Sequence, residues 1–206
     1  FIGVAGIGMS GLAKAVKALG HEVSGSDVQE NWAVQELRER GVAVRVGHEA
    51  CNAEGADLVV YSSAIREDNP EYRFAHATGI PVIHRAELLA CFMNRGKGIG
   101  VLGTHGKTTT TSLVSHLLTR MGLRPTCFVG AKMINFHDNV LLGDQNWVVA
   151  EVDESDGTHR LFSPAYVVLT NIEEDHLDHY ANLADIQASF REFLAKDSII
   201  RQYLMA

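Results

Sequence analysis

Short apolar runs alternate along the chain with segments whose apolar residues recur at helical spacing. In the first half, the runs have the length of buried strands and predict strands at 1–5, 21–25, 42–46, 58–61 and 81–83. The segments between them predict helices at 9–19, 32–40, 69–77 and 85–93, with Gly20 and Gly41 as C-terminal stops. This alternation is typical of a parallel sheet that helices cover on both faces.

A polar, glycine-rich stretch at 94–98 predicts a short linker, after which a second series begins. We predict strands at 99–102, 126–129, 147–152 and 166–170, and helices at 107–121 and 186–195. The sequence therefore predicts two α/β domains, 1–95 and 96–206. Because the second series offers only about four strands, we expect this domain to be incomplete and the sequence to be the front part of a longer protein.

Composition narrows the classes of function. Hydrophobic residues make up 46% and charged residues 21%, as in a soluble globular protein. The net charge of −7 argues against a nucleic-acid or anionic-membrane partner, and no apolar run is long enough to span a membrane. Cys51, Cys91 and Cys127 are widely spaced, which favours a reducing cytoplasm over a disulfide framework. Eight of the 25 acidic residues lie between Glu151 and Asp178, a first indication of a cation site.

A glycine-rich loop follows the first predicted strand and opens the first predicted helix. Its sequence is G-x-G-x-x-G, from Gly6 to Gly11, and Asp27 follows the next strand. Glycines let the backbone approach a diphosphate, and an acid after the second strand often binds a ribose hydroxyl. The pattern suggests a nicotinamide-dinucleotide domain, yet such a turn can also serve strand–helix packing alone. The motif by itself does not identify the ligand.

A second loop, Gly103-Thr104-His105-Gly106-Lys107-Thr108-Thr109, lies between a predicted buried strand and a helix. Backbone N–H groups there can surround phosphate oxygens, Lys107 can neutralise β/γ-phosphate charge, and Thr108 can ligate magnesium. The common pattern G-x-x-x-x-G-K-[ST] is not met, because Val101 stands where its first glycine belongs. With the preceding strand, two glycines and four consecutive threonines, this shorter form still predicts phosphate binding.

Acidic and histidine residues follow two further strands of the second series. Glu151 ends one strand, and His176 lies in an Asp-His-Leu-Asp-His run after another. Carboxyl ends of parallel strands meet at one sheet edge, so both segments should lie beside the phosphate loop. A solvated acidic turn and a dinuclear metallohydrolase are the alternatives, but the second needs more His/Asp clusters than the sequence offers. We predict magnesium ligands at Glu151 and His176.

Together these motifs resemble the Mur ligase family, and the resemblance runs over essentially all 206 residues. The matching segments, in chain order, are 6–13, 24–27, 62–65, 84–87, 103–111, 153–156 and 170–179. Seven ordered motifs are far more specific than any one of them. The resemblance implies a Rossmann-like N-terminal domain, then a partial P-loop central domain, with the C-terminal ligase domain of the family absent from this sequence.

The resemblance also implies the ligands of both loops. The first would bind UDP-N-acetylmuramate rather than a redox cofactor, through Gly8, Met9, Ser10, Asp27, Ser62, Ser63 and Arg85. The second would bind ATP through residues 103–109, with Mg²⁺ on Thr108, Glu151 and His176. Lys107, Glu151 and His176 would be the catalytic residues of an ATP-dependent amide ligase of peptidoglycan precursor synthesis, with L-alanine as amino donor.

Two alternatives to this function stay open. A related ligase of the family takes a peptide in place of alanine, and the amino-donor determinants are expected outside this sequence. A nucleotide-binding module without ligase turnover would carry the same loops. Neither alternative changes the expected binding residues.

Overall fold

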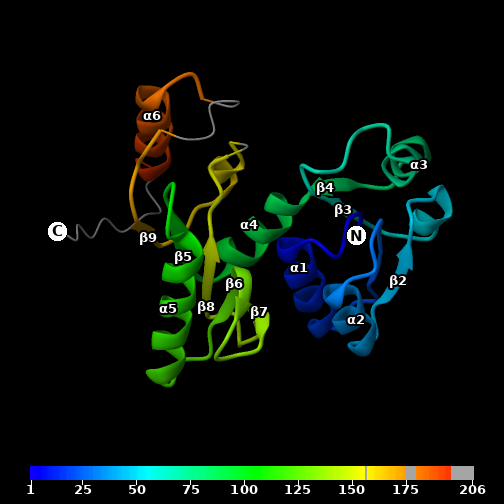
Figure 1. The fold of residues 1–206 in the computed structure, drawn as a ribbon, viewed down its shortest axis with the longest axis horizontal. Helices are drawn as coiled ribbons and strands as arrows, with labels where there is room; N and C mark the ends of the chain where they lie inside the picture. The colour runs from blue at the N-terminus through cyan, green and yellow to red at the C-terminus, as the bar shows by residue number, and fades with distance from the viewer. Residues whose placement is uncertain (156, 175–179, 196–206) are drawn as a thin grey trace. The chain divides into compact units, whose positions relative to one another are not determined.

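The computed structural model describes residues 1–155, 157–174 and 180–195. Its contacts divide the chain into two compact units, Phe1–Leu89 and Ala90–Ala206. The division lies inside the helix α4, Arg85–Arg95, a few residues before the boundary that the sequence suggested. Each unit is described by itself (Figure 1).

Unit 1 holds two pairs of parallel strands. β1 (Ser24–Asp27) pairs with β2 (Ala43–Val46), and β3 (Val59–Tyr61) pairs with β4 (Val82–His84). The N-terminal segment joins the pairs, because Ile2 bridges Ser26 in parallel and its N–H donates to Val60 O at 2.9 Å. The strands therefore lie in the order β2, β1, N-terminal segment, β3, β4. This is the strand order of a doubly wound nucleotide-binding fold.

The first predicted strand is therefore reduced to a single bridge. Gly3 adopts φ 74°, which interrupts the extended backbone between Ile2 and Val4. The segment nevertheless stays in place, because the Gly3 and Val4 amides both donate to Ser26 O at 2.9 Å. The prediction of a regular strand over 1–5 was wrong, but the position of the segment in the row is that of a strand.

Helices of unit 1 pack on these strands around two apolar clusters. The elements are α1 (Ile7–Ala18), α2 (Trp32–Glu39), the 3₁₀ turn η1 (Ala50–Ala53) and α3 (Pro70–Thr78). One cluster includes Val4, Leu37 and Val44, and the other includes Ile2 and Val59. Asparagine side chains cap α2 and α3, which explains why both helices begin where the sequence indicated.

Unit 2 is built on one five-stranded sheet in the order β7-β6-β8-β5-β9. Its strands are β5 (Lys97–Leu102), β6 (Thr126–Met133), β7 (Asp138–Leu141), β8 (Trp147–Glu151) and β9 (Tyr166–Leu169). All neighbours pair in parallel except β6 and β7, which form an antiparallel pair. The α/β class predicted from the sequence is confirmed.

Two details of unit 2 differ from the sequence prediction. The predicted linker at 94–98 is wrong, because α4 runs to Arg95 and β5 begins at Lys97, which leaves only Gly96 between them. The strand β7 was not predicted, since it opens with Asp138 and Asn139, which nevertheless are 8% and 1% exposed. A strand whose buried residues are polar cannot be predicted from the alternation of hydrophobic and polar residues.

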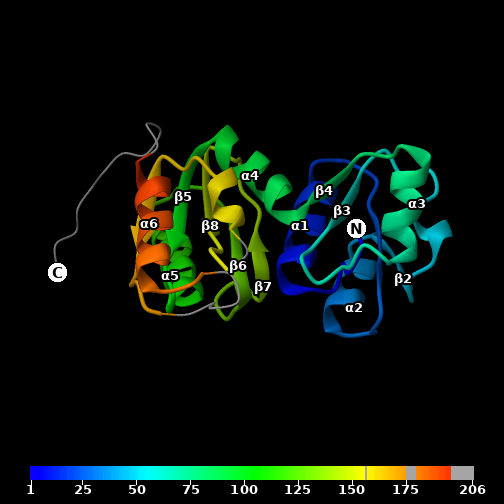
Figure 2. The same ribbon diagram turned by 90° about the horizontal axis from the view of Figure 1, so that it is seen from above.

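Helices cover both faces of this sheet. The helix α5 (Lys107–Arg120) lies along the sheet in Figures 1 and 2, and its Val114 and Leu118 pack with Cys127 of β6. The next residue of β6, Phe128, points to the opposite face and contacts Phe92 of α4, with ring centroids 5.2 Å apart. The remaining elements are η2 (Thr158–Leu161) and α6 (Leu183–Leu194). No helix in the described part of the chain has the length and apolar character needed to cross a membrane.

Candidate active site

The loop between β5 and α5 lies at the carboxyl edge of the sheet, and the segment after β9 holds it. The Thr104 amide donates to Asn171 O at 3.3 Å, and the His105 amide donates to Asn171 Oδ1 at 2.9 Å. Thr170 Oγ1 donates to His105 O at 2.7 Å. These bonds fix the loop backbone before any ligand binds, as electrostatic preorganisation requires.

Gly103 is the position in this loop that admits no side chain. Its φ is 133°, and a Cβ built there would overlap Thr170 Oγ1 and lie 2.8 Å from Asn171 O. The close approach of β9's end to the loop therefore depends on glycine at this position. Thr104 is buried, whereas His105 and Thr109 are exposed beside it.

Lys107, the first residue of α5, turns its ammonium group back onto the loop. Nζ donates to Gly103 O at 2.6 Å and to Thr104 O at 3.3 Å. It also lies 3.0 Å from Oε1 of Glu154, whose side chain is 2% exposed. Burial raises the pKa of Glu154, and the Lys107 ammonium opposes that rise. The lysine thus brings its positive charge to the loop, where a phosphate would need it.

Thr108 and Glu151 meet as the sequence suggested. Thr108 Oγ1 donates to Glu151 Oε2 at 3.1 Å, although 43 residues separate them. The Gly130 amide, which the sequence did not single out, donates to Glu151 Oε1 at 2.6 Å. Burial raises the pKa of Glu151, while the bonds from Gly130 and Thr108 and the charge of Lys107 act against the rise. A hydroxyl and a half-buried carboxylate at this edge are oxygen donors of the kind that magnesium prefers.

The third predicted magnesium ligand, His176, lies outside the described residues. Within the described part, no three His, Cys, Asp or Glu side chains converge as a metal-binding group. Thr108 and Glu151 are thus the two predicted ligands that the structure brings together, and the role of His176 stays a prediction.

In unit 1, the glycine-rich loop and Arg85 come together. The helix α1 begins at Ile7, and a Cβ added to Gly8 would lie 3.6 Å from Arg85 Nη1. Met9 and Ser10 are buried, and Ser10 Oγ donates to Ile7 O at 3.1 Å. The Ser10 amide already donates to Gly6 O at 2.8 Å. A diphosphate here would therefore contact the backbone N–H groups that precede Ser10 at the helix N-terminus, rather than these side chains.

The other predicted residues of unit 1 follow the strand ends. Asp27 ends β1, and its Oδ2 accepts a 2.9 Å hydrogen bond from the Ala5 amide, which ties the carboxylate to the start of the glycine-rich loop. Ser62 and Ser63 follow β3, and Ser63 Oγ lies 3.0 Å from Nε2 of His84 at the end of β4. All of them belong to the edge where doubly wound folds bind nucleotides.

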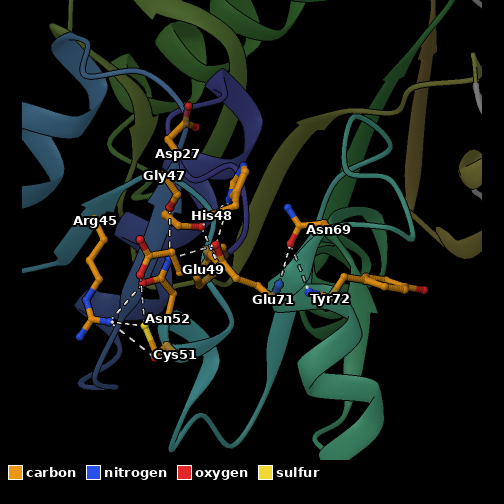
Figure 3. Close-up of polar contacts among 12 residues, drawn as sticks. Asp27, Arg45, Gly47, His48, Glu49, Cys51, Asn52, Asn69, Glu71 and Tyr72 are labelled. Atoms are coloured by element: carbon orange, nitrogen blue, oxygen red, sulfur yellow. Dashed lines mark hydrogen bonds and ion pairs between the residues drawn. The ribbon is translucent and has the colours of Figure 1, made fainter.

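A buried polar network behind Asp27 was not predicted. Glu71, in the first turn of α3, is 2% exposed and accepts hydrogen bonds from Ser26 Oγ at 2.8 Å and Asn52 Nδ2 at 3.1 Å. His48 Nδ1 lies 2.9 Å from Glu71 Oε1. Figure 3 shows His48, Asn52 and Glu71 close together, from the segment after β2 and from α3. The contacts span 19 to 45 residues of sequence, so no local pattern could reveal them.

Two family models match this chain in order. The Mur ligase family, catalytic domain, matches residues 1–97, and the Mur ligase middle domain matches residues 101–200. The chain belongs to the Mur ligase family. The family resemblance inferred from the motifs is thereby confirmed.

Individual Mur ligases match over nearly the whole chain. It is 49% identical over 196 residues to a UDP-N-acetylmuramate–L-alanine ligase of Sorangium cellulosum. The structure of UDP-N-acetylmuramate–alanine ligase MurC from Thermotoga maritima superposes with a TM-score of 0.87 at 37% identity and covers 94% of the chain. A UDP-N-acetylmuramate:L-alanyl-γ-D-glutamyl-meso-diaminopimelate ligase from Neisseria superposes with the same TM-score of 0.87 at 29% identity and covers 98% of the chain.

The chain spans only part of these relatives. It corresponds to 42% of the Sorangium cellulosum protein, 46% of the Thermotoga maritima chain and 68% of the Neisseria chain.

Proposed function

We propose that the protein to which this chain belongs is an ATP-dependent ligase that joins L-alanine to UDP-N-acetylmuramate, in the synthesis of peptidoglycan precursors. The observation that carries the proposal is the phosphate loop itself. Lys107 Nζ lies 3.0 Å from the carboxylate of Glu154, just beyond β8, and Thr108 Oγ1 lies 3.1 Å from that of Glu151, at the end of β8. Among the solved structures, the 37% identity to the alanine ligase, against 29% to the peptide ligase, favours alanine as the amino donor.

Residues Gly103, Thr104, His105, Gly106, Lys107, Thr108 and Thr109 would bind the triphosphate of ATP. The loop enters a 14-residue helix whose first N–H groups and dipole favour a bound anion. The Lys107 ammonium adds a full positive charge beside the loop carbonyls it contacts. Together these groups offset the charge that gathers when a carboxylate meets a triphosphate.

The oxygen donors beside the loop suit Mg²⁺, which takes carboxylate and hydroxyl ligands. Thr108 Oγ1 and Glu151 Oε2 would hold the ion, and His176 is the third proposed ligand. A bound Mg²⁺ would withdraw electrons from the phosphoryl oxygens and neutralise their charge. Glu151 is well suited to this role, because its half-buried carboxylate accepts hydrogen bonds from Gly130 and Thr108 and keeps lone pairs for a cation.

Unit 1 would bind the UDP-sugar at the carboxyl edge of its strands. The N-terminus of α1, where Gly8, Met9 and Ser10 lie, would receive the diphosphate on its first backbone N–H groups, and Arg85 beside Gly8 would add a positive charge. Asp27, Ser62 and Ser63 would bind the uridine part. The strand order favours a nucleotide at this edge, and the family match favours a UDP-sugar over a nicotinamide cofactor.

The chemistry follows from the poor reactivity of a carboxylate. Its oxygen would attack the γ-phosphorus of ATP, the bond to ADP would break, and an acyl phosphate would form. The alanine amine would then attack the acyl carbon, phosphate would leave, and the nitrogen would lose a proton. Lys107 would stabilise charge on the transferred phosphoryl group.

Because this reaction consumes ATP and the three cysteines carry no disulfide, we assign the protein to the cytoplasm.

The test is phosphate release by the full-length protein with ATP, Mg²⁺ and UDP-N-acetylmuramate. Alanine, glycine, serine and the tripeptide L-alanyl-γ-D-glutamyl-meso-diaminopimelate are compared as amino donors. Release that depends on alanine supports the proposal, and release that depends on the tripeptide assigns the protein to the peptide-ligase branch instead. Binding of ATP and UDP-N-acetylmuramate without release under any donor would leave only a nucleotide-binding module.

A further inference from the structure

The function proposed above assigns no chemical task to the carboxylate of Glu154, yet this group makes an ion pair with Lys107 of the phosphate loop. Lys107 Nζ lies 3.0 Å from its Oε1 and 3.3 Å from its Oε2. The side chains of Lys107 and Glu154 are 16% and 2% exposed, so water screens this pair far less than it screens a surface ion pair. Its contribution to the position of Lys107 is correspondingly large.

Glu154 is anchored more firmly than its partner. Its backbone O accepts hydrogen bonds from Tyr180 Oη at 2.9 Å and from the Gly157 amide at 3.1 Å. Three residues earlier the chain is still part of the sheet, where Glu151 ends β8. Lys107, by contrast, reaches the carboxylate through a long, flexible side chain. These backbone bonds hold the segment that carries the carboxylate beside Lys107.

The contacts of Lys107 define what a phosphate must do to reach it. An ammonium group has three protons, and here Gly103 O, Thr104 O and the Glu154 carboxylate accept them. A phosphate oxygen that bonds Nζ must share or displace one of these acceptors. Of the three, Glu154 alone is charged, so it both holds the ammonium over the loop and competes with an anionic ligand for it.

Glu151 does not perform the same task. Its oxygens accept from Thr108 Oγ1 and the Gly130 amide, and Lys107 reaches it only as a charge at longer range. Two carboxylates three residues apart thus serve two adjacent loop residues. The burial that raises the pKa of Glu154 and the opposing effect of Lys107 agree with a carboxylate matched to one ammonium.

We propose that Glu154 is a positioning residue that holds the Lys107 ammonium over the phosphate loop and releases it in part to the nucleotide phosphates. The proposal rests on the ligase function proposed above, because it assigns to Lys107 a bond to the transferred phosphoryl group. According to this proposal, the contact weakens nucleotide binding, because it competes with the phosphates for the ammonium. It also raises kcat, because it keeps Lys107 where it can stabilise the transferred phosphoryl group.

The experiment compares Glu154→Gln and Glu154→Asp in the full-length protein. Glutamine keeps the size of the side chain and one acceptor oxygen but removes the charge. Aspartate keeps the charge on a side chain that is one methylene shorter, so the carboxylate lies farther from Lys107. Glu192→Gln is the matched control, because Glu192 is a 65% exposed carboxylate of the same unit, paired with Arg160. Circular dichroism and thermal unfolding show whether each variant is folded.

Two readouts separate positioning from damage. For Glu154→Gln we expect a non-hydrolysable ATP analogue with Mg²⁺ to bind about threefold more tightly, because a negative charge beside the phosphates is gone. We expect kcat for phosphate release to fall about tenfold or more, with KM for UDP-N-acetylmuramate unchanged. Glu154→Asp should bind the analogue like wild type and have an intermediate kcat. The control should match wild type in both.

A structural role alone would weaken analogue binding and kcat together, and that result in a folded Glu154→Gln protein would overturn the proposal. Unchanged analogue binding and kcat in both Glu154 variants would overturn it as well. If Glu154→Gln does not fold, Glu154→Asp decides, since a wild-type kcat there excludes a positioning role. Failure of the ligase proposal is distinguishable, because it appears as no amino-donor-dependent phosphate release in wild type, while analogue binding is still measured in every protein.

Discussion

Thr108 Oγ1 donates a hydrogen bond to Glu151 Oε2 at 3.1 Å, which joins the first turn of α5 to the end of β8. The parallel register makes this possible, because β5 and β8 are neighbours and Val101 pairs with Glu151. The phosphate loop and the acidic strand end therefore emerge side by side. The geometry supports a shared cation site, since hydroxyl and carboxylate oxygens would face the same ion.

Replacement of Lys107 by alanine should remove most ligase activity and spare UDP-sugar binding. The ammonium is the positive side chain that bonds the loop carbonyls of Gly103 and Thr104, so its loss removes charge stabilisation from the phosphoryl transfer. We expect kcat to fall about 100-fold or more in the full-length protein. Calorimetry with UDP-N-acetylmuramate should give the wild-type dissociation constant. Lys132→Ala, at an exposed position of the same unit, is the control, and equal turnover in the two variants would refute the role.

Replacement of Glu151 by glutamine should raise the Mg²⁺ concentration needed for activity. The amide keeps an acceptor for Thr108 but loses the charge that attracts the ion. Titration of phosphate release against Mg²⁺ should shift to higher concentration by about tenfold or more. His176→Ala is expected to shift the same titration in the same direction. An unchanged magnesium requirement would remove either residue from the ligand set, and Glu192→Gln shows the effect of losing a distant carboxylate.

The raised pKa of Glu151 predicts how stability depends on pH without metal. Because burial raises the folded-state pKa above its ordinary value of 4.5, the folded state holds the proton more tightly than the unfolded state. The free energy of unfolding due to this group is then highest below that value and falls as pH rises through the interval above it. The difference in urea midpoint between Glu151→Gln and wild type should therefore grow in favour of the variant as the pH rises above 4.5. A pH-independent difference would contradict the shift.

The sequence predicted most of the fold because its signals are local. Every described α-helix was expected within a few residues, since apolar spacing and caps such as Asn69 act over short distances. The strand expected at 1–5 is only a bridge, because the left-handed Gly3 interrupts it, and β7 was not expected, because it begins with buried polar residues. Both exceptions are set by tertiary contacts rather than by a repeating pattern.

The candidate site divides in the same way. Lys107, Thr108 and Glu151 were predicted because each lies next to a strand end that a parallel sheet brings to one edge. The Gly130 amide and the Glu154 carboxylate were not assigned partners, since their contacts join residues 21 and 47 positions apart. An amide in a strand and a second acid after Glu151 carry no distinguishing signal in the sequence.

The three cysteines should differ sharply in reactivity. Cys51 and Cys91 are exposed, whereas Cys127 is buried in the sheet core, where burial raises the pKa of its thiol to about 12. A thiol needs both access and a thiolate to be alkylated, and Cys127 lacks both. Iodoacetamide at neutral pH should modify Cys51 and Cys91 in the native protein and Cys127 only in denaturant, as peptide mass spectrometry can show. Rapid native labelling of Cys127 would contradict the packing of β6 against α5.

Replacement of Glu71 by alanine should destabilise unit 1 more than any surface change. The carboxylate accepts from Ser26 and Asn52 and lies 2.9 Å from His48 Nδ1, so its removal takes a hydrogen-bond partner from polar groups of three segments. We expect the free energy of unfolding to fall by about 3 kcal/mol. Glu71→Gln should lose less, because its amide oxygen still accepts one of these bonds. Urea denaturation measures the loss, and Glu67→Ala, at an exposed position of the same unit, is the matched control. A loss no greater than that of the control would mean that the network does not hold β1 and α3 together.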